Sequence, residues 1–256
     1  MRAGARLALA LVGAAVLAVV LGPVALLVHD GWGPLLRLDL RVSAAAEDAG
    51  QAAPALLAAA RVLTHLGDPV LVTVATVVVA GVLLRRGRLR PAVFLLVGRT
   101  GALLLSQVTK VAVDRARPEF EDPVASAFGA SFPSGHALGG TVFWTTLALV
   151  LLPRVPRRRV VLAGALLVAL VVCATRVLLG VHYLSDVAAG LLLGLAWTAV
   201  CASLFALWRA EEGAPVDGLE DGVADSAEDA VADDTGTTAG PVGKQVVRDD
   251  RRGGPR

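Results

Sequence analysis

Cysteine is scarce in this chain. Its 256 residues include two, Cys173 and Cys201, and both lie inside apolar runs. Small buried hydrophobic side chains are expected in such surroundings, which argues against a disulfide framework or a thiolate metal site. Basic residues do not form a stripe interleaved with aromatic side chains, so nothing in the sequence indicates binding to nucleic acid.

Apolar residues, in contrast, dominate the chain: 55% are hydrophobic, and the mean hydropathy is +0.68. A soluble domain of this length would be more polar, so the composition predicts an integral membrane protein. The first apolar run, residues 7–28, carries no charge and is long enough to cross a bilayer as a helix. A cleaved signal peptide has a shorter apolar region, so we interpret this run as a retained span. Five more spans are predicted, at residues 66–84, 91–110, 134–152, 160–178 and 185–207.

Clusters of arginine predict the orientation of these spans. The connections 85–90 and 154–159 are the densest in positive charge, and with Arg2 and Arg6 they fall on one side of a six-span topology. The positive-inside rule places that side in the cytoplasm. Both termini are then cytoplasmic, and the outward connections are residues 29–65, 111–133 and 179–184. The first of these is rich in alanine and leaves room for a short surface helix.

Composition also divides the chain into three parts. Residues 1–60 hold the first span and an outer segment, residues 61–208 hold the other five spans, and residues 209–256 form a tail. Within this tail, residues 211–243 contain ten carboxylates and no lysine or arginine. Such a composition predicts a disordered cytoplasmic segment, either merely solvated or engaged in regulation or partner binding.

Three polar clusters interrupt the apolar background, and the predicted topology puts each at the outward end of a span. They cover residues 110–118, 133–136 and 176–186. The first and third clusters contribute three cations, Lys110, Arg117 and Arg176, near a boundary of low dielectric constant. Fixed cations of this kind suit an oxyanion, and the planar fork of arginine matches phosphate oxygens.

The clusters also supply the groups that phosphoryl chemistry requires. Ser134 and Gly135 lie at a predicted helix start, where free backbone N–H groups point at a bound anion. His182 and Asp186 are four residues apart, so they share a helix face, and the carboxylate can orient the imidazole as a nucleophile. His136 comes from a different span and is a candidate general acid for the leaving oxygen. Each feature alone has an ordinary structural explanation, but their combination favours a catalytic site.

These motifs together resemble the type-2 phosphatidic acid phosphatase superfamily, whose signature is K-x6-R-P, then P-S-G-H, then S-R-x5-H-x3-D. Residues 110–118 and 133–136 match the first two elements in full. Arg176, His182 and Asp186 match the third, with Thr175 in place of the serine. The segment T-H-L-G-D at residues 64–68 is also similar to one common in bacterial members, and the resemblance covers roughly residues 60–205.

The resemblance implies a role for each matching residue. His182 would attack phosphorus and form a phosphohistidine, Asp186 would support it, and His136 would protonate the leaving group. The phosphate oxygens would be bound by Lys110, Arg117, Ser134, Gly135 and Arg176. No metal or other cofactor is implied, and the sequence offers no carboxylate-rich cage that would hold a metal.

We therefore expect an all-α cell-membrane protein of six transmembrane helices with its active site at the outer face. The expected partner is a lipid phosphate whose tail stays in the bilayer, and no nucleic acid is expected. Undecaprenyl pyrophosphate is the first expectation for this lipid, with phosphatidic acid and phosphatidylglycerol phosphate as alternatives. A phosphotransferase using the same site and a non-catalytic membrane protein are the rival hypotheses.

One charge falls inside a predicted span. Arg99 lies about eight residues beyond Pro91, roughly 12 Å along a helix, so its side chain can reach the inner interface. Because a charge within the membrane is costly, we expect Arg99 to extend toward that interface rather than to serve the site.

Overall fold

The computed structural model describes residues 3–118 and 128–211, and the regular structure within these ranges is helical throughout. Eight α-helices and two short 3-10 turns follow one another along the described chain. Their bounds are α1 Ala3–His29, α2 Gly33–Ala52, α3 Pro54–Leu63, η1 Thr64–Gly67, α4 Pro69–Arg85, α5 Leu89–Val113, α6 Gly135–Leu151, η2 Leu152–Arg154, α7 Arg158–Leu178 and α8 Leu184–Glu211. The all-α expectation is confirmed for this part of the chain. The predicted tail was residues 209–256: its first three residues belong to α8, and the rest, from residue 212 onward, lies outside the described residues.

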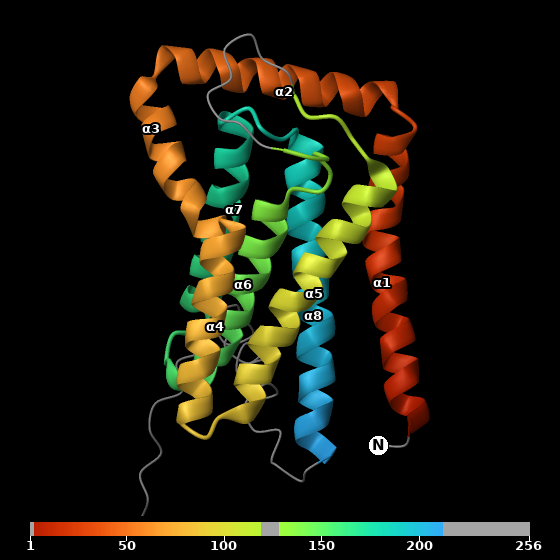
Figure 1. Ribbon diagram of the computed structural model, residues 1–256, viewed down its shortest axis with the longest axis vertical. Coiled ribbons are helices and arrows are strands. Elements are labelled where there is room, and N and C mark those ends of the chain that lie inside the picture. The colour runs from red at the N-terminus through yellow and green to blue at the C-terminus, as the bar shows by residue number, and fades with distance from the viewer. Residues whose placement is uncertain (1–2, 119–127, 212–256) are drawn as a thin grey trace, which may run out of the picture. The chain divides into compact units, whose positions relative to one another are not determined.

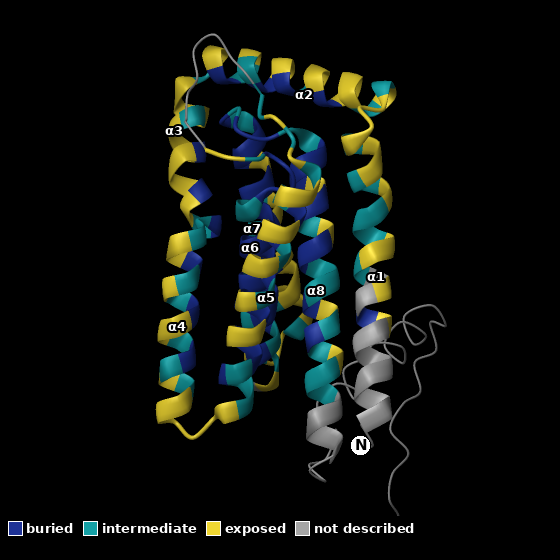
Figure 2. Ribbon diagram, turned by 45° about the vertical axis from the view of Figure 1, so that its right-hand side comes forward, coloured by how far each residue is buried: buried dark blue, intermediate teal, exposed yellow. Residues whose placement is uncertain are grey.

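Helix α6 forms the centre of the bundle. It packs against α4, α5, α7 and α8, and most of its residues are buried (Figure 2). Small residues allow its closest contacts: a Cβ atom added to Gly190 of α8 would lie 2.8 Å from the carbonyl oxygen of Ser134. One turn further along α8, a Cβ at Gly194 would lie 2.8 Å from that of Thr141. Close approach of helix backbones through small residues is typical of membrane helix packing.

Helix α2 lies across one end of the bundle, nearly at right angles to its neighbours (Figure 1). It packs against α7 and α8, and the chain turns by 85° between α1 and α2. The connection from α5 to α6 and the turn from α7 to α8 lie at this same end (Figure 1), which we call the α2 end. The arginine-rich connections, residues 86–88 and 152–157, lie at the other end.

Six helices of the structure coincide with the six predicted apolar runs. Judged by length and composition, however, fewer than six membrane spans are found. Among the described residues, α5, α7 and α8 are each long and apolar enough to cross a membrane. Counting each bent pair as one span, namely α1 with α2 and α3–η1 with α4, gives up to five. Helix α6 is apolar but has 17 residues, at the lower limit for a spanning helix.

The expectation for Arg99 is wrong. Its side chain is 4% exposed and turns toward the start of α4, where Nε donates to Thr73 Oγ1 at 2.8 Å and Nη2 donates to the Pro69 carbonyl at 2.7 Å. Helices α4 and α5 run antiparallel, so the first turn of α4 brings these acceptors within reach of the middle of α5. Two hydrogen bonds inside the protein thus replace the contact with the interface that the sequence suggested.

Candidate active site

His182 lies in the tight turn between α7 and α8, and Asp186 lies in the first turn of α8. Gly180, with φ +69°, takes the left-handed conformation that this turn requires. The side chains of His182 and Asp186 are 3% and 0% exposed, and His182 Nδ1 lies 3.6 Å from Asp186 Oδ2. The turn therefore aims the imidazole at the carboxylate, as the four-residue spacing predicted.

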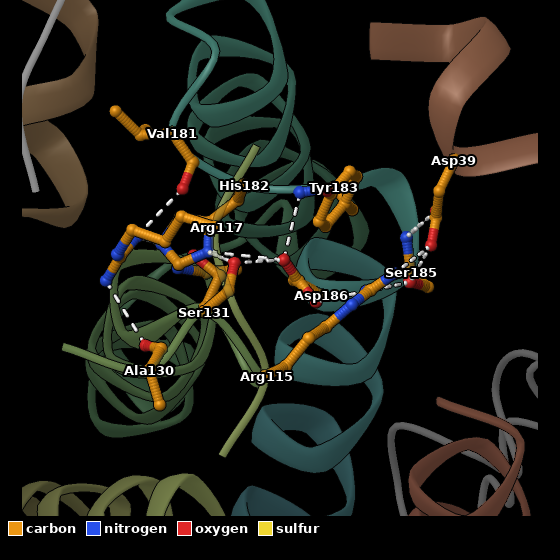
Figure 3. Close-up of polar contacts among 12 residues, drawn as sticks. Asp39, Arg115, Arg117, Ala130, Ser131, Val181, His182, Tyr183, Ser185 and Asp186 are labelled. Atoms are coloured by element: carbon orange, nitrogen blue, oxygen red, sulfur yellow. Dashed lines mark hydrogen bonds and ion pairs between the residues drawn. The ribbon is translucent and has the colours of Figure 1, made fainter. Parts of the chain in front are cut away.

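Ser131 joins these two side chains (Figure 3). Its hydroxyl donates to Asp186 Oδ2 at 2.5 Å and lies 3.3 Å from His182 Nδ1. A hydroxyl that donates its one hydrogen bond to the carboxylate can still accept a hydrogen bond from the ring N–H. The imidazole is thus linked to Asp186 through Ser131 as well as by direct proximity.

Arg117 fixes which nitrogen of His182 carries the proton. Its Nη1 lies 3.2 Å from His182 Nε2, and a guanidinium has no acceptor. The contact is favourable only when Nε2 presents its lone pair, which leaves the proton on Nδ1, toward Ser131 and Asp186. That tautomer is the one a nucleophile attacking through Nε2 requires.

Burial keeps this imidazole neutral. The pKa of His182 falls from 6.5 to about 4, first because burial disfavours the imidazolium and also because Arg117 and Arg176 are nearby cations. The attraction of Asp186 works in the opposite direction but does not outweigh these effects. The neutral form of this imidazole is therefore the one present throughout the neutral range.

A fourth cation, Arg115, neutralises the carboxylates around the turn. Its Nη1 lies 2.6 Å from Asp186 Oδ1, and its Nη2 lies 2.7 Å from Oδ2 of Asp39, which α2 supplies. Burial acts against the charge of Arg115, but the attraction of Asp186 and the hydrogen bonds to both carboxylates raise its pKa above the usual value. Arg115 thus forms the direct ion pairs with both of these carboxylates.

Those three cations are the ones that the sequence proposed for phosphate. Arg117 donates to the carbonyls of Phe128, Gly129, Ala130 and Val181, so it holds the end of the α5–α6 connection over the turn without a carboxylate partner among these contacts. Burial lowers the pKa of Arg117, and the attraction of Asp186 only partly offsets this effect. Lys110, at the end of α5, is half-buried and within electrostatic reach of Arg117 and Asp186.

Arg176, in the last turn of α7, is 7% exposed. Its Nη1 donates to Thr64 Oγ1 at 2.9 Å, whereas its Nε is buried without a hydrogen-bond partner among the described residues. Because buried polar atoms are normally paired, an unpaired guanidinium N–H indicates room for an anionic acceptor. The neighbouring Thr175 donates its hydroxyl to the Val172 carbonyl of its own helix, so this hydroxyl bonds within α7.

The start of α6 forms the remaining wall. Ser134 is the N-cap: its hydroxyl accepts from the Ala137 N–H at 3.4 Å, and its own N–H donates to the Asp186 carbonyl at 3.0 Å. Gly135 and His136 follow in the first turn, where backbone N–H groups are free to bind an anion. His136 Nε2 lies 3.9 Å from Oδ2 of Asp68. The other carboxylate oxygen of Asp68, Oδ1, accepts from backbone N–H groups at the start of α4 and caps that helix.

All eight candidate residues thus come from three segments that meet at the α2 end. The arrangement combines a neutral, oriented imidazole, a second histidine and three cations, which can bind a phosphate and transfer its phosphoryl group. Within the described residues, no group of three or more His, Cys, Asp or Glu side chains is placed to hold a metal ion. Fold and site together are those of a helical membrane protein whose side chains suit the binding of a phosphate ester.

Comparison with known proteins makes this class specific. The family model of the PAP2 superfamily matches residues 91–210. Phosphatidylglycerophosphatase B of Bacillus subtilis is 33% identical over 138 residues, which cover 52% of this chain and 67% of that protein. The chain belongs to the PAP2 superfamily, which confirms the resemblance seen in the sequence and the expectation of a phosphatase.

Two further comparisons extend this result. The lipid A 1-phosphatase of Rhizobium johnstonii is 37% identical over 117 residues, which cover 40% of this chain and 43% of that relative, less than half its length. The crystal structure of a transmembrane PAP2 type phosphatidylglycerolphosphate phosphatase from Bacillus subtilis matches with a TM-score of 0.65 and 28% identity. The match covers 73% of this chain and 94% of that one.

Sequence reasoning missed three residues of the network: Asp39, Arg115 and Ser131. Arg115 lies between two motif residues, and Ser131 lies two residues before Pro133, so proximity to a motif was a usable signal for both. Asp39 is separated from the motifs by some seventy residues of chain, and its only local signal is a carboxylate between two leucines.

Proposed function

We propose that this protein hydrolyses a lipid phosphate without a metal, through a phosphohistidine formed on His182. One observation carries the proposal: the buried imidazole presents the lone pair of Nε2 beside Arg117, while Nδ1 faces Ser131 and Asp186. A histidine held in this tautomer beside a cation is suited to attack phosphorus in a bound phosphate.

The proposed reaction has two steps. Nε2 of His182 forms a bond to phosphorus as the bond to the lipid oxygen breaks, and a protonated His136 gives its proton to that oxygen. Water then attacks the phosphohistidine and loses a proton to His136, which releases phosphate and restores both histidines. Lys110, Arg117 and Arg176, with Ser134 and the backbone N–H of Gly135, would stabilise the charge on the equatorial oxygens.

The proposed substrate is an amphiphile. The relatives' names point to phosphatidylglycerol phosphate first, whereas the sequence alone had favoured undecaprenyl pyrophosphate. Both have a charged head and an apolar tail, which suits a site at one end of an apolar helical bundle. In the proposed arrangement the six helices cross the cell membrane, the α2 end faces outward, and the termini are cytoplasmic.

Phosphate release by detergent-purified protein in excess EDTA tests this function. Phosphatidylglycerol phosphate, phosphatidic acid and undecaprenyl pyrophosphate serve as substrates, with His182→Ala as the test variant. His29→Ala is the matched control, because His29 is exposed at the end of α1. We expect turnover that survives EDTA, persists in the control and disappears in His182→Ala.

Turnover by His182→Ala at a rate near wild type would refute the histidine mechanism. Loss of activity in EDTA that returns with added divalent cation would refute the metal-free claim. Transfer of phosphate to an acceptor other than water, with no free phosphate released, would instead identify a phosphotransferase.

A further inference from the structure

Helix α2 buries polar as well as small residues on the face that it turns toward the bundle. Asp39 and Ser43 are buried there, at 0% and 6% exposure, together with Ala46 and Gly50, whereas three leucines are exposed: Leu36, Leu38 and Leu40. This pattern is the reverse of that of a helix packing by apolar contact alone. It indicates that polar contacts help to seat α2, in addition to the apolar packing of Ala46. Helix α2 lies outside residues 91–210, which the family model matches.

Both carboxylate oxygens of Asp39 have partners from the site (Figure 3). Oδ1 accepts from the Ser185 N–H at 2.9 Å, and Oδ2 accepts from the Ser185 hydroxyl at 2.6 Å and from Arg115 Nη2 at 2.7 Å. Ser185 immediately precedes Asp186. Asp39 therefore holds the first turn of α8 both through its backbone and through the Arg115 guanidinium.

Arg115 transmits this contact to Asp186. The same guanidinium donates through Nη1 to Ser185 Oγ at 2.7 Å and to Asp186 Oδ1 at 2.6 Å. It also lies over the Tyr183 ring, 4.1 Å from the ring centroid. Because each terminal nitrogen of the guanidinium binds a carboxylate, the orientation of Arg115 toward Asp186 is constrained. Asp186 Oδ2 is left facing Ser131, His182 and the Tyr183 N–H.

We propose that Asp39 is a positioning residue for the reaction: through Arg115 it locks Asp186 in the orientation that supports His182. The inference rests on the proposed function and extends it to α2. When α2 is seated, the guanidinium is anchored at both ends. Without the charge of Asp39 the guanidinium is anchored at one end only. Asp186 is then held through Oδ2, which accepts from Ser131 Oγ and from the Tyr183 N–H at 2.9 Å, but its Oδ1 loses a fixed partner, and the imidazole is aligned less firmly toward phosphorus.

Kinetics of Asp39→Asn, with phosphatidylglycerol phosphate in detergent micelles, test the proposal. This variant keeps the size of the side chain and an oxygen acceptor for Ser185 but removes the charge that anchors Arg115. Asp48→Asn is the matched control, because it makes the same change at an exposed position of the same helix. Arg115→Gln, the double variant and His182→Ala are measured in parallel, with the melting temperature of each.

We expect Asp39→Asn to lower kcat by about tenfold or more while KM stays within about twofold of wild type. In the Arg115→Gln background the same substitution should lower kcat by less than about twofold, because the side chain that links Asp39 to Asp186 is already absent. Asp48→Asn should behave as wild type.

An unchanged kcat in Asp39→Asn would overturn the proposal. So would a rise in KM that accompanies a fall in melting temperature, since that pattern belongs to a structural contact. If Asp39→Asn lowers kcat in the Arg115→Gln background as much as it does in wild type, Asp39 does not act through Arg115. Activity persisting in His182→Ala would instead count against the proposed function, whatever the behaviour of Asp39→Asn.

Discussion

Burial and hydrogen bonding act in opposite directions on the imidazole of His182. Burial and the neighbouring arginines favour the neutral ring, while Asp186 favours the charged one, and the balance leaves the pKa at about 4. The proposed role of His182 as a nucleophile requires a ring that is unprotonated yet oriented, and this balance supplies both conditions. The carboxylate holds the ring without protonating it at neutral pH.

This depressed pKa predicts a pH dependence of stability. The unfolded chain binds a proton at His182 near pH 6.5, whereas the folded protein does so only near pH 4. The neutral histidine therefore contributes to stability fully above about pH 6.5, and this contribution is lost as the pH falls toward 4. Melting temperatures from pH 7 to pH 4 should fall more steeply for wild type than for His182→Asn. Parallel curves for the two proteins would contradict the assignment.

Ser131 yields a second prediction at this scale. Ser131→Ala removes the hydroxyl that lies between Asp186 and the ring nitrogen, so kcat should fall by about tenfold to a hundredfold. The matched control is Ser203→Ala, because Ser203 is exposed and donates to a carbonyl of its own helix. Initial rates of phosphate release provide the measurement, and a rate for Ser131→Ala within about twofold of wild type would show that the link is dispensable.

Sequence and structure agree best where chemistry is encoded locally. The pairing of His182 with Asp186 could be predicted from their spacing of four residues. The three cations could be predicted from the motifs in which they stand. The partners that hold them could not be found in this way. Whether a carboxylate such as Asp39 is exposed or bound to Arg115 depends on contacts between distant segments, which no local pattern encodes.

At the scale of elements, the tight contact between α6 and α8 positions Ser134 beside Asp186. A methyl group at Gly190 would lie 2.8 Å from the Ser134 carbonyl and 3.0 Å from Ala137 Cβ. Neither atom can move without shifting the start of α6, where the N–H groups that we propose to bind phosphate lie. The glycine thus links helix packing directly to the site.

Gly190→Ala should accordingly lower stability by about 1–3 kcal/mol through overpacking and reduce turnover. Gly164→Ala on α7 is the matched control, since an added Cβ there meets nothing within 4 Å. The control should be neutral or more stable by about 0.5–1 kcal/mol, because alanine loses less conformational entropy in a helix. Melting temperatures of the two variants that change in the same direction would rule out this explanation.

The positions of the helices could largely be predicted from the sequence. The positions of the residues that hold the site residues in place could not. The apolar runs placed α5, α7 and α8 to within a few residues, because unbroken apolar composition is what a buried or lipid-facing helix needs. Helix α2 was expected only as a short surface helix, yet it has 20 residues and supplies Asp39. Its role depends on where it docks, and docking is a property of the assembled bundle.

At the scale of the whole molecule, the arginine-rich connections and the candidate active site lie at opposite ends of the bundle. The arginine-rich connections are far from the α2 end along the helices (Figure 1), and we propose, on the positive-inside rule, that they lie in the cytoplasm. A lipid phosphate would then reach the site from the outer leaflet.

Labelling of introduced cysteines in intact cells tests this orientation. Phe128 is 92% exposed in the α5–α6 connection, and Arg86 is exposed after α4. A membrane-impermeant maleimide should label Phe128→Cys directly and Arg86→Cys only after permeabilisation, with wild type as the blank because its two cysteines are buried. The reverse pattern would place the site on the cytoplasmic side.

The central claim is that His182 carries the phosphoryl group, and trapping that intermediate tests it most directly. Enzyme mixed with radiolabelled lipid phosphate in EDTA is quenched in alkali during the first turnover, and the labelled peptide is mapped. The account predicts an alkali-stable, acid-labile label on the peptide containing His182, absent from His182→Ala. Active enzyme that accumulates no label, or label on another residue, would contradict it.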